Sequence, residues 1–133
     1  MDTGEDRFKP YGLYISRPVR DALEDHLYEA AGVVDLEGYF EPSASAIPAG
    51  DPGAEATHDL VASVVTDFTT LYDEADFAAA ESLAHDAFEL TYLAAEPETV
   101  AAARERFEAA TIIRETDLRT VHTAVLEARL SAE

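Results

Sequence analysis

The sequence predicts a mainly α-helical single domain, residues 1–133, built as an antiparallel bundle of about four helices with a small N-terminal β-α-β element. Three observations predict this fold class. Apolar residues recur at helical spacing through most of the chain after residue 55. Two short stretches before residue 41 have the composition or the alternation of strands. A chain of 133 residues with 47% hydrophobic residues can also bury one core.

The N-terminal residues predict an arm, a strand and a helix in that order. Residues 1–10 are polar and charged, so we expect a flexible arm. The stretch 11–15 is aromatic and β-branched, which predicts a strand. Ser16 and Pro18 are residue types that favour the N-cap and the first turn of a helix. Together with apolar residues at helical spacing, they predict a helix over 17–31.

A second strand is predicted after this helix. Gly32 predicts the end of the helix, because glycine readily takes the left-handed conformation of a C-terminal cap. Residues 33–40 alternate between apolar and acidic or small side chains, as in a half-buried strand. The two strands and the helix between them would form the β-α-β element of residues 11–41.

The remaining residues predict a linker and a helical bundle. Residues 42–56 are rich in Pro, Ala, Gly and Ser and predict a loop or linker, although Asp51 and Pro52 would also start a helix. The bundle is expected over 57–131, with short links that favour antiparallel neighbours. No glycine or proline separates its last two helices, so one long helix is an alternative, and no repeat of fixed period is evident. The four predicted helices cover residues 55–72, 76–94, 97–114 and 117–131.

Charge is distributed very unevenly along the chain. Residues 21–103 contain no Lys or Arg and 19 Asp and Glu, which equals the formal net charge of -19 for the whole chain. The flanking segments are therefore nearly neutral. If the acidic middle has intramolecular cationic partners, they must come from residues 7–20 or from the five Arg between 104 and 129.

The composition resembles that of proteins from halophilic archaea that keep concentrated salt in the cytoplasm. The chain has one Lys and eight Arg, and it lacks Asn, Gln, Cys and Trp. At 1 M salt the Debye length is about 3 Å, so neighbouring carboxylates hardly repel each other. A codon bias toward G and C would favour the same composition. The absence of Cys excludes disulfides and thiol chemistry. With no signal-like or membrane-spanning run, we expect a cytoplasmic protein with no membrane partner.

One metal-ligand pattern occurs on the predicted helix 76–94. Glu81, His85 and Glu89 are spaced by four residues and would lie on one side of that helix. His58 and His122 would complete a three-histidine zinc site with His85 if the bundle brought them together. The pattern Glu-x-x-His, which helical di-metal sites use on each of two helices, occurs only once, at residues 55–58, so a solvated acidic face is the simpler interpretation and we predict no cofactor.

The N-terminal segment holds the only cluster of basic and aromatic residues. Such a mixture can stack on bases and contact phosphate, so a transcription regulator that binds nucleic acid is one alternative function. Because affinity for phosphate depends on Lys and Arg, the acidic surface argues against nucleic acid as a partner. Pairing of these bases with nearby acids is the structural alternative. The four bases are Arg7, Lys9, Arg17 and Arg20.

The leading functional hypothesis is a protein–protein interaction or assembly module. The sequence has no phosphate-binding glycine-rich loop, no G-x-S-x-G and no H-E-x-x-H, which favours a non-catalytic protein. We expect a protein partner or a homodimer, with a metal-binding bundle as a further alternative. The association surface is predicted from the apolar positions of the two strands, which are Leu13, Ile15, Val34, Leu36 and Phe40.

Overall fold

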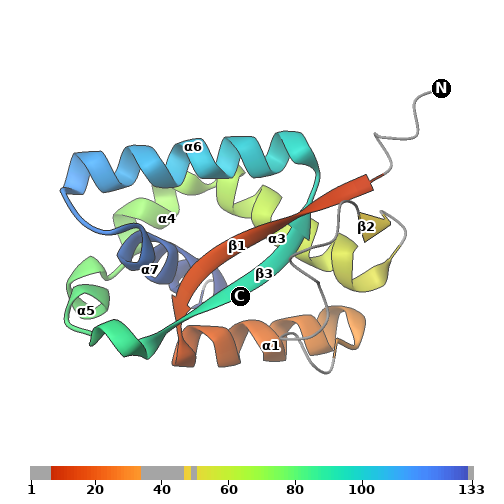
Figure 1. Ribbon diagram of the computed structural model, residues 1–133, viewed down its shortest axis with the longest axis horizontal. Coiled ribbons are helices and arrows are strands. Elements are labelled where there is room, and N and C mark those ends of the chain that lie inside the picture. The colour runs from red at the N-terminus through yellow and green to blue at the C-terminus, as the bar shows by residue number, and fades with distance from the viewer. Residues whose placement is uncertain (1–6, 34–46, 49–50, 132–133) are drawn as a thin grey trace.

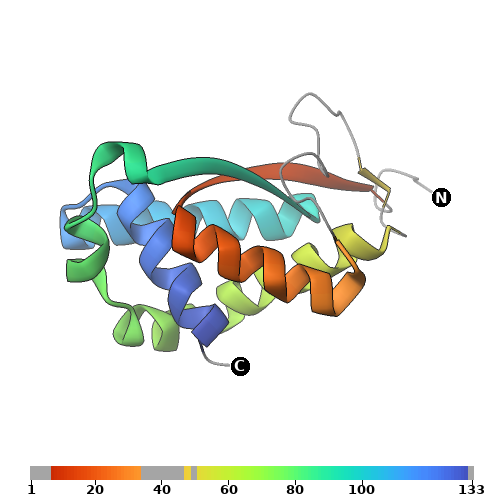
Figure 2. The ribbon, with the colours of Figure 1, turned by 90° about the horizontal axis from the view of Figure 1, so that it is seen from below.

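A curved antiparallel ribbon lies over a layer of helices in the computed structural model, which describes residues 7–33, 47–48 and 51–131 (Figures 1 and 2). Figure 2 shows the helices on one side of the ribbon, so that one face of the ribbon is covered by them. The chain is mostly helical. Its described elements are β1 (Arg7–Ser16), α1 (Arg17–Ala31), β2 (Ile47–Pro48), α3 (Pro52–Thr66), α4 (Phe68–Glu74), α5 (Phe77–Glu81), the 3-10 turn η2 (His85–Ala87), β3 (Phe88–Ala95), α6 (Pro97–Arg114) and α7 (Leu118–Ser131).

The ribbon consists mainly of β1 and β3. These strands pair antiparallel from Lys9 opposite Ala95 to Ser16 opposite Phe88. The two residues of β2 pair antiparallel with the start of β1, which gives the strand order β2-β1-β3. The ribbon therefore brings together two segments that are far apart in the sequence.

The core lies between the ribbon and the helices. Side chains of a strand alternate between its faces, and Tyr11, Leu13 and Ile15 of β1 all point into the core. They meet apolar side chains from the helices, each of which contributes about 1.5–3 kcal/mol when fully buried. The fully buried large residues of this core include Leu23, Leu27, Leu60, Leu93, Val100, Val121 and Val125.

The first helix forms as the sequence predicts. The Ser16 hydroxyl accepts a hydrogen bond from the Val19 N–H at 3.4 Å, and Pro18 occupies the first turn. Gly32 ends the helix in the left-handed conformation, with φ of 73°. Both ends therefore satisfy backbone groups that the helix itself leaves unpaired.

The outer edge of β3 is satisfied by two adjacent side chains of α3. The Ala94 N–H donates to Oγ1 of Thr57 at 3.1 Å, and the Thr57 hydroxyl donates back to the Ala94 carbonyl at 2.7 Å. The Glu96 N–H donates to Nδ1 of His58 at 3.2 Å. Thr57 thus replaces the residue that a neighbouring strand would offer, and this edge cannot pair further there.

The outer edge of β1 is satisfied in the same way by α7. The Tyr14 N–H donates to Nδ1 of His122 at 3.1 Å, and the Ser16 N–H donates to Oγ1 of Thr123 at 3.1 Å. Both acceptors are buried, although threonine and histidine are polar. Their burial is explained by the unpaired strand amides that they face.

The two ends of the chain form an internal repeat. Apart from the two-residue strand β2, the described elements follow the order strand–helix–helix twice, as β1, α1, α3 and as β3, α6, α7. A shift of 80 residues carries Ser16, which caps α1, onto Glu96, which caps α6. The same shift carries Tyr14 onto Ala94. The backbone N–H groups of all four residues, Tyr14, Ser16, Ala94 and Glu96, donate to side chains of helices. Figures 1 and 2 accordingly show α6 and α1 along opposite edges of the ribbon, under the same face of it.

The predicted helix over 76–94 is wrong. Asp76 caps a helix as expected, but α5 ends at Glu81 and residues 88–95 form β3. Leu93 and Ala95 suit a helical stripe as well as a strand, and pairing with the whole length of β1 decides between the two. Strand formation often depends on such partners more than on local preference.

Three other predicted segments differ from the structure. Residues 7–10 belong to β1 and not to a flexible arm. The predicted loop over 42–56 contains β2 and the start of α3, which Asp51 caps through its side chain. The predicted helix over 55–72 is divided at Asp67 into α3 and α4.

The last two helices are separate, and the bundle is not confirmed. Glu115 takes the left-handed conformation between α6 and α7, with φ of 54°, which excludes one continuous helix. The helices lie against one face of the ribbon and also pack on one another there. The second strand of the predicted β-α-β element, residues 33–40, lies outside the described residues except Val33, which is buried and not in a strand.

Two buried threonines predict opposite effects of the same substitution. The Thr91 hydroxyl is buried without a hydrogen-bond partner among the described residues, so Thr91→Val should raise the free energy of unfolding by about 1 kcal/mol. Thr57→Val should lower it by about 2 kcal/mol, because the backbone of Ala94 loses its partner. Urea unfolding of both variants in molar KCl measures the two changes. Equal losses in the two variants would contradict this account.

Candidate functional site

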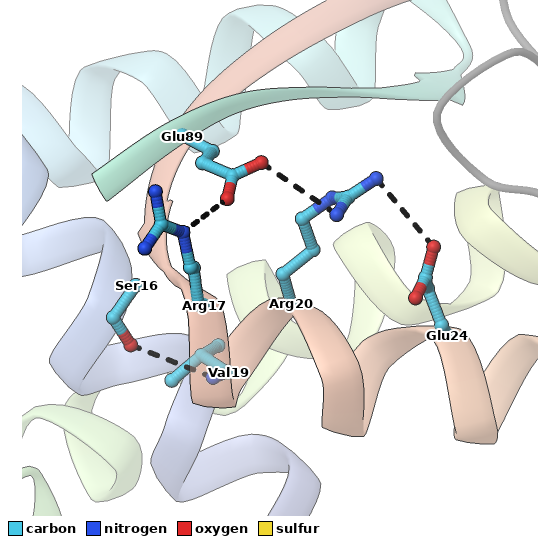
Figure 3. Close-up of polar contacts among 6 residues, drawn as sticks. All are labelled: Ser16, Arg17, Val19, Arg20, Glu24 and Glu89. Atoms are coloured by element: carbon cyan, nitrogen blue, oxygen red, sulfur yellow. Dashed lines mark hydrogen bonds and ion pairs between the residues drawn. The ribbon is translucent and has the colours of Figure 1, made fainter. Parts of the chain in front are cut away.

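Two arginines at the start of α1 are held by acids of the acidic middle (Figure 3). The Arg17 Nε donates to Oε2 of Glu89 at 2.7 Å. Arg20 lies 3.6 Å from the other oxygen of Glu89 and 3.5 Å from Glu24. Because β1 ends where α1 begins, and Glu89 lies opposite Ile15 in the register, the fold places these charges together.

This cluster argues against the nucleic-acid alternative. A phosphate would have to displace the Glu89 carboxylate from its ion pairs with Arg17 and Arg20. Both arginine side chains are more exposed than the residues of the core. Lys9 is exposed at the far end of β1, away from them. Arg7 begins that strand, but its side chain lies outside the described part of the structure. The four bases therefore do not form one continuous basic surface among the described side chains.

The residues predicted to bind a metal are not arranged on one helix. Glu81 ends α5, His85 begins η2 and Glu89 lies in β3, so the spacing that motivated the site does not bring them onto one face. Glu89 is bound to two arginines. Among the described side chains, which do not include that of His85, no group of three His, Asp or Glu is placed to hold a metal ion.

The other two histidines of the zinc alternative lie at opposite edges of the ribbon. His58 accepts from β3, stacks on Phe8 with ring centroids 5.0 Å apart, and has Nε2 3.2 Å from a Glu96 carboxylate oxygen. His122 accepts from β1 and packs edge-on against Phe107. The two imidazoles therefore have structural roles and do not converge.

The predicted association surface is also wrong where it can be examined. Leu13 and Ile15 are only 3% and 0% exposed, because the face of β1 that carries them points to the helices. Val34, Leu36 and Phe40 lie outside the described residues. The opposite face of the ribbon carries the exposed side chains Tyr14 and Leu90.

Most arginines of the last two helices contact aromatic rings. Arg104 lies over Tyr11 at 5.7 Å, Arg114 over Phe77 at 4.1 Å, and Arg119 over Phe88 at 5.4 Å, measured from Cζ to the ring centroid. Two of these rings belong to the segment that lacks bases. The C-terminal helices thus do pack against the acidic middle, but through ring faces more than through carboxylates.

An apolar groove lies between α4 and α6. It has a volume of about 470 Å³. The α4 wall consists of Phe68, Thr69 and Tyr72, and the α6 wall consists of Glu105, Arg106, Ala109, Ala110 and Ile113. Hollows of this size, with apolar walls and a few polar groups, are typical of binding sites.

The end of α6 exposes two large apolar side chains beside this groove. Ile112 is 76% exposed and Ile113 is 72% exposed. The helix already buries Val100, Ala103, Phe107 and Ala110 toward the core. Neither isoleucine takes part in that contact, so neither side chain contributes to the core of the single chain.

A second, more polar hollow lies between α1 and α3. It has a volume of about 560 Å³, and its charged or titratable lining residues are His26, Glu55, Asp59 and Arg129. Arg129 is already engaged, because its Nε donates to the Ser63 hydroxyl at 2.7 Å. This hollow offers no apolar surface comparable to that of the α4–α6 groove, which is therefore the better candidate.

Comparison with protein-family models, with curated proteins and with solved structures gives no match. In the described part of the chain, no helix combines the length and the apolar character that crossing a bilayer requires.

The groove was missed by the sequence analysis, although one signal for it was available. Ile112 and Ile113 fall outside the apolar stripe that continues from Val100 to Ala110. Two consecutive large apolar residues beyond the stripe indicate a contact that the helix does not make with its own core. The α4 wall of the groove could not be predicted, because the sequence analysis did not predict the break at Asp67 that separates α3 from α4.

His122 predicts a specific loss of stability in mild acid. Burial lowers the pKa of His122 to about 3, whereas the unfolded side chain titrates near 6.5. Between these values the unfolded state binds the extra proton, so the free energy of unfolding falls as the pH falls through this window. From pH 7 to pH 5 this loss is about 2 kcal/mol, and above pH 7 it vanishes.

The variant His122→Asn tests this assignment. Its side-chain oxygen can still accept from the Tyr14 N–H but does not titrate in this range. Denaturant unfolding of both proteins at pH 8, 7 and 5 should show the same difference at the two higher pH values and a smaller acid loss in the variant. An acid loss of equal size in both proteins would contradict a buried neutral His122.

Proposed function

We propose that the protein is a cytoplasmic, salt-adapted assembly module that binds an apolar helical surface of a protein in the groove between α4 and α6. The exposure of Ile112 and Ile113 beside this groove is the observation that carries the proposal. Burying either side chain in a complex would contribute about 2 kcal/mol. Leaving both in water has no benefit for the stability of the single chain.

The internal repeat supports a role beyond folding. Under the shift of 80 residues, α1 ends where α6 reaches Thr111, so the final turn of α6 has no counterpart in the first half. Ile112 and Ile113 lie in this added turn. The other wall, α4, lies between the two repeated units and has no counterpart either. The α4 wall and the end of the α6 wall at Ile113 are therefore additions to the repeated core, whereas the rest of the α6 wall belongs to the repeat.

The shape of the groove supports a helix as the bound element. Its two walls are helices, and a third helix can lay an apolar face between them with side chains spaced by three or four residues. The half-buried rings of Phe68 and Tyr72 form the floor on the α4 side. Aromatic residues in such positions are typical anchors of protein contacts.

The groove can be tested with a synthetic peptide. A labelled amphipathic helix of about 15 residues, with Leu at helical spacing and Glu beside it, should bind the protein in molar KCl. Ile113→Asp should weaken this binding at least about tenfold, because it places a charge in the apolar wall. Fluorescence anisotropy measures the affinity.

The control is Tyr28→Asp, which alters a side chain that is 61% exposed on α1, outside the groove. It should leave peptide binding unchanged. Both substitutions are at exposed positions, and circular dichroism will confirm that both variants are folded. Equal binding by all three proteins would refute the groove as the binding site.

A further inference from the structure

We infer that the helical surface bound in this groove belongs to a second copy of the same chain, which forms a two-fold symmetric dimer through α4 and α6. The inference rests on the proposed function of the groove and names its partner. In such a dimer each copy contributes the same surface, so that surface must complement itself in charge and in shape. The exposed face of α6 meets the charge requirement and carries the apolar side chains that such a contact buries.

Charge favours α6 over the other helices as the place where two copies meet. The whole chain carries a formal charge of -19, so contact between most of its surfaces brings like charges together. The sequence of α6 contains three Arg and three Glu and is neutral. By comparison α1 contains two Arg and four acids, and α3 and α4 contain acids only. The helix α7 has two Arg and one Glu, but its residues 120–126 are buried. Two copies that meet through α6 avoid most of the repulsion between them.

The groove also carries one acid and one base side by side. Glu105 and Arg106 are adjacent, exposed and part of the same wall. Within the described residues Arg106 makes no hydrogen bond or ion pair, unlike Arg17, Arg20 and Arg129. A two-fold axis that crosses α6 near these residues would place Arg106 of each copy against Glu105 of the other. The contact would then satisfy both charges twice.

Apolar surface on the same helix supports the contact. Ile113 lines the groove near the C-terminal end of α6, and both it and Ile112 are mostly exposed. A two-fold axis near Glu105 and Arg106 sets the two α6 helices antiparallel, and Ile113 then lies about 11 Å from the axis along its helix. There it faces the first half of the partner's α6, so that the dimer covers apolar surface on both sides of the charged pair.

Sedimentation velocity tests the dimer directly. The unmodified protein should sediment as a dimer at micromolar concentration, in the lowest KCl concentration at which circular dichroism shows it folded. Ile113→Asp should raise the dimer dissociation constant at least about tenfold, and Tyr28→Asp should leave it unchanged. A monomer at all accessible concentrations, or a dimer that Ile113→Asp leaves intact, would overturn the inference.

A charge exchange identifies the pair. Arg106→Glu and Glu105→Arg should each weaken the dimer, because each variant brings two like charges together across the axis. An equimolar mixture of the two variants should form a heterodimer, since each then offers the charge that the other lacks. The double variant E105R/R106E should dimerise again by itself. A mixture that stays monomeric while the double variant also fails would refute this pairing.

The peptide experiment separates this inference from the proposed function. A protein that binds the peptide at the groove but remains monomeric refutes the dimer and leaves the groove as a site for a different protein. A protein that neither binds the peptide nor dimerises refutes both. In the dimer, the peptide should compete with the second copy, so that adding it shifts sedimentation toward the monomer.

Discussion

The fold depends on how a two-stranded ribbon satisfies its two outer edges. A ribbon of two strands leaves a row of unpaired amide and carbonyl groups on each side, and isolated ribbons are rarely stable. Here α3 offers Thr57 and His58 to β3, and α7 offers His122 and Thr123 to β1. Each helix packs beneath the ribbon and reaches one edge with two adjacent side chains. The buried polar groups of the core are therefore a consequence of the ribbon's edges.

This arrangement links the two halves of the chain to each other. The strand of the first half, β1, is satisfied by the helix α7 of the second half, and β3 of the second half is satisfied by α3 of the first. Neither half could bury its own strand edge with its own helices in this geometry. The ribbon therefore depends on both halves of the chain, and β1 needs α7, which is far away in the sequence, to satisfy its outer edge.

Local signals in the sequence predicted α1, α6 and α7 well and the ribbon poorly. Ser16, Pro18 and Gly32 determine α1 through caps that act within a few residues. The end of α6 was also predicted from signals within a few residues of it. The strand β3 could not be recognised, because residues 88–95 acquire their role only by pairing with β1. For the same reason Leu13 and Ile15 were assigned to the wrong face. The candidate groove depends on this tertiary arrangement, and only the two isoleucines at its rim were visible in the sequence.

The use of arginine distinguishes structural positions from the candidate contact surface. A chain with one Lys and eight Arg retains guanidinium groups, which are planar and can both pair with carboxylates and stack on rings. Salt screens long-range attraction strongly, but contacts at a ring face or with a closely held carboxylate are affected less. Arg17, Arg20, Arg104, Arg114 and Arg119 all make contacts of these kinds. Arg106 makes none among the described residues, yet it lies on the one neutral long helix beside exposed isoleucines. In a chain that has few bases, a base without an internal contact at an apolar groove is best explained by a partner that supplies the carboxylate.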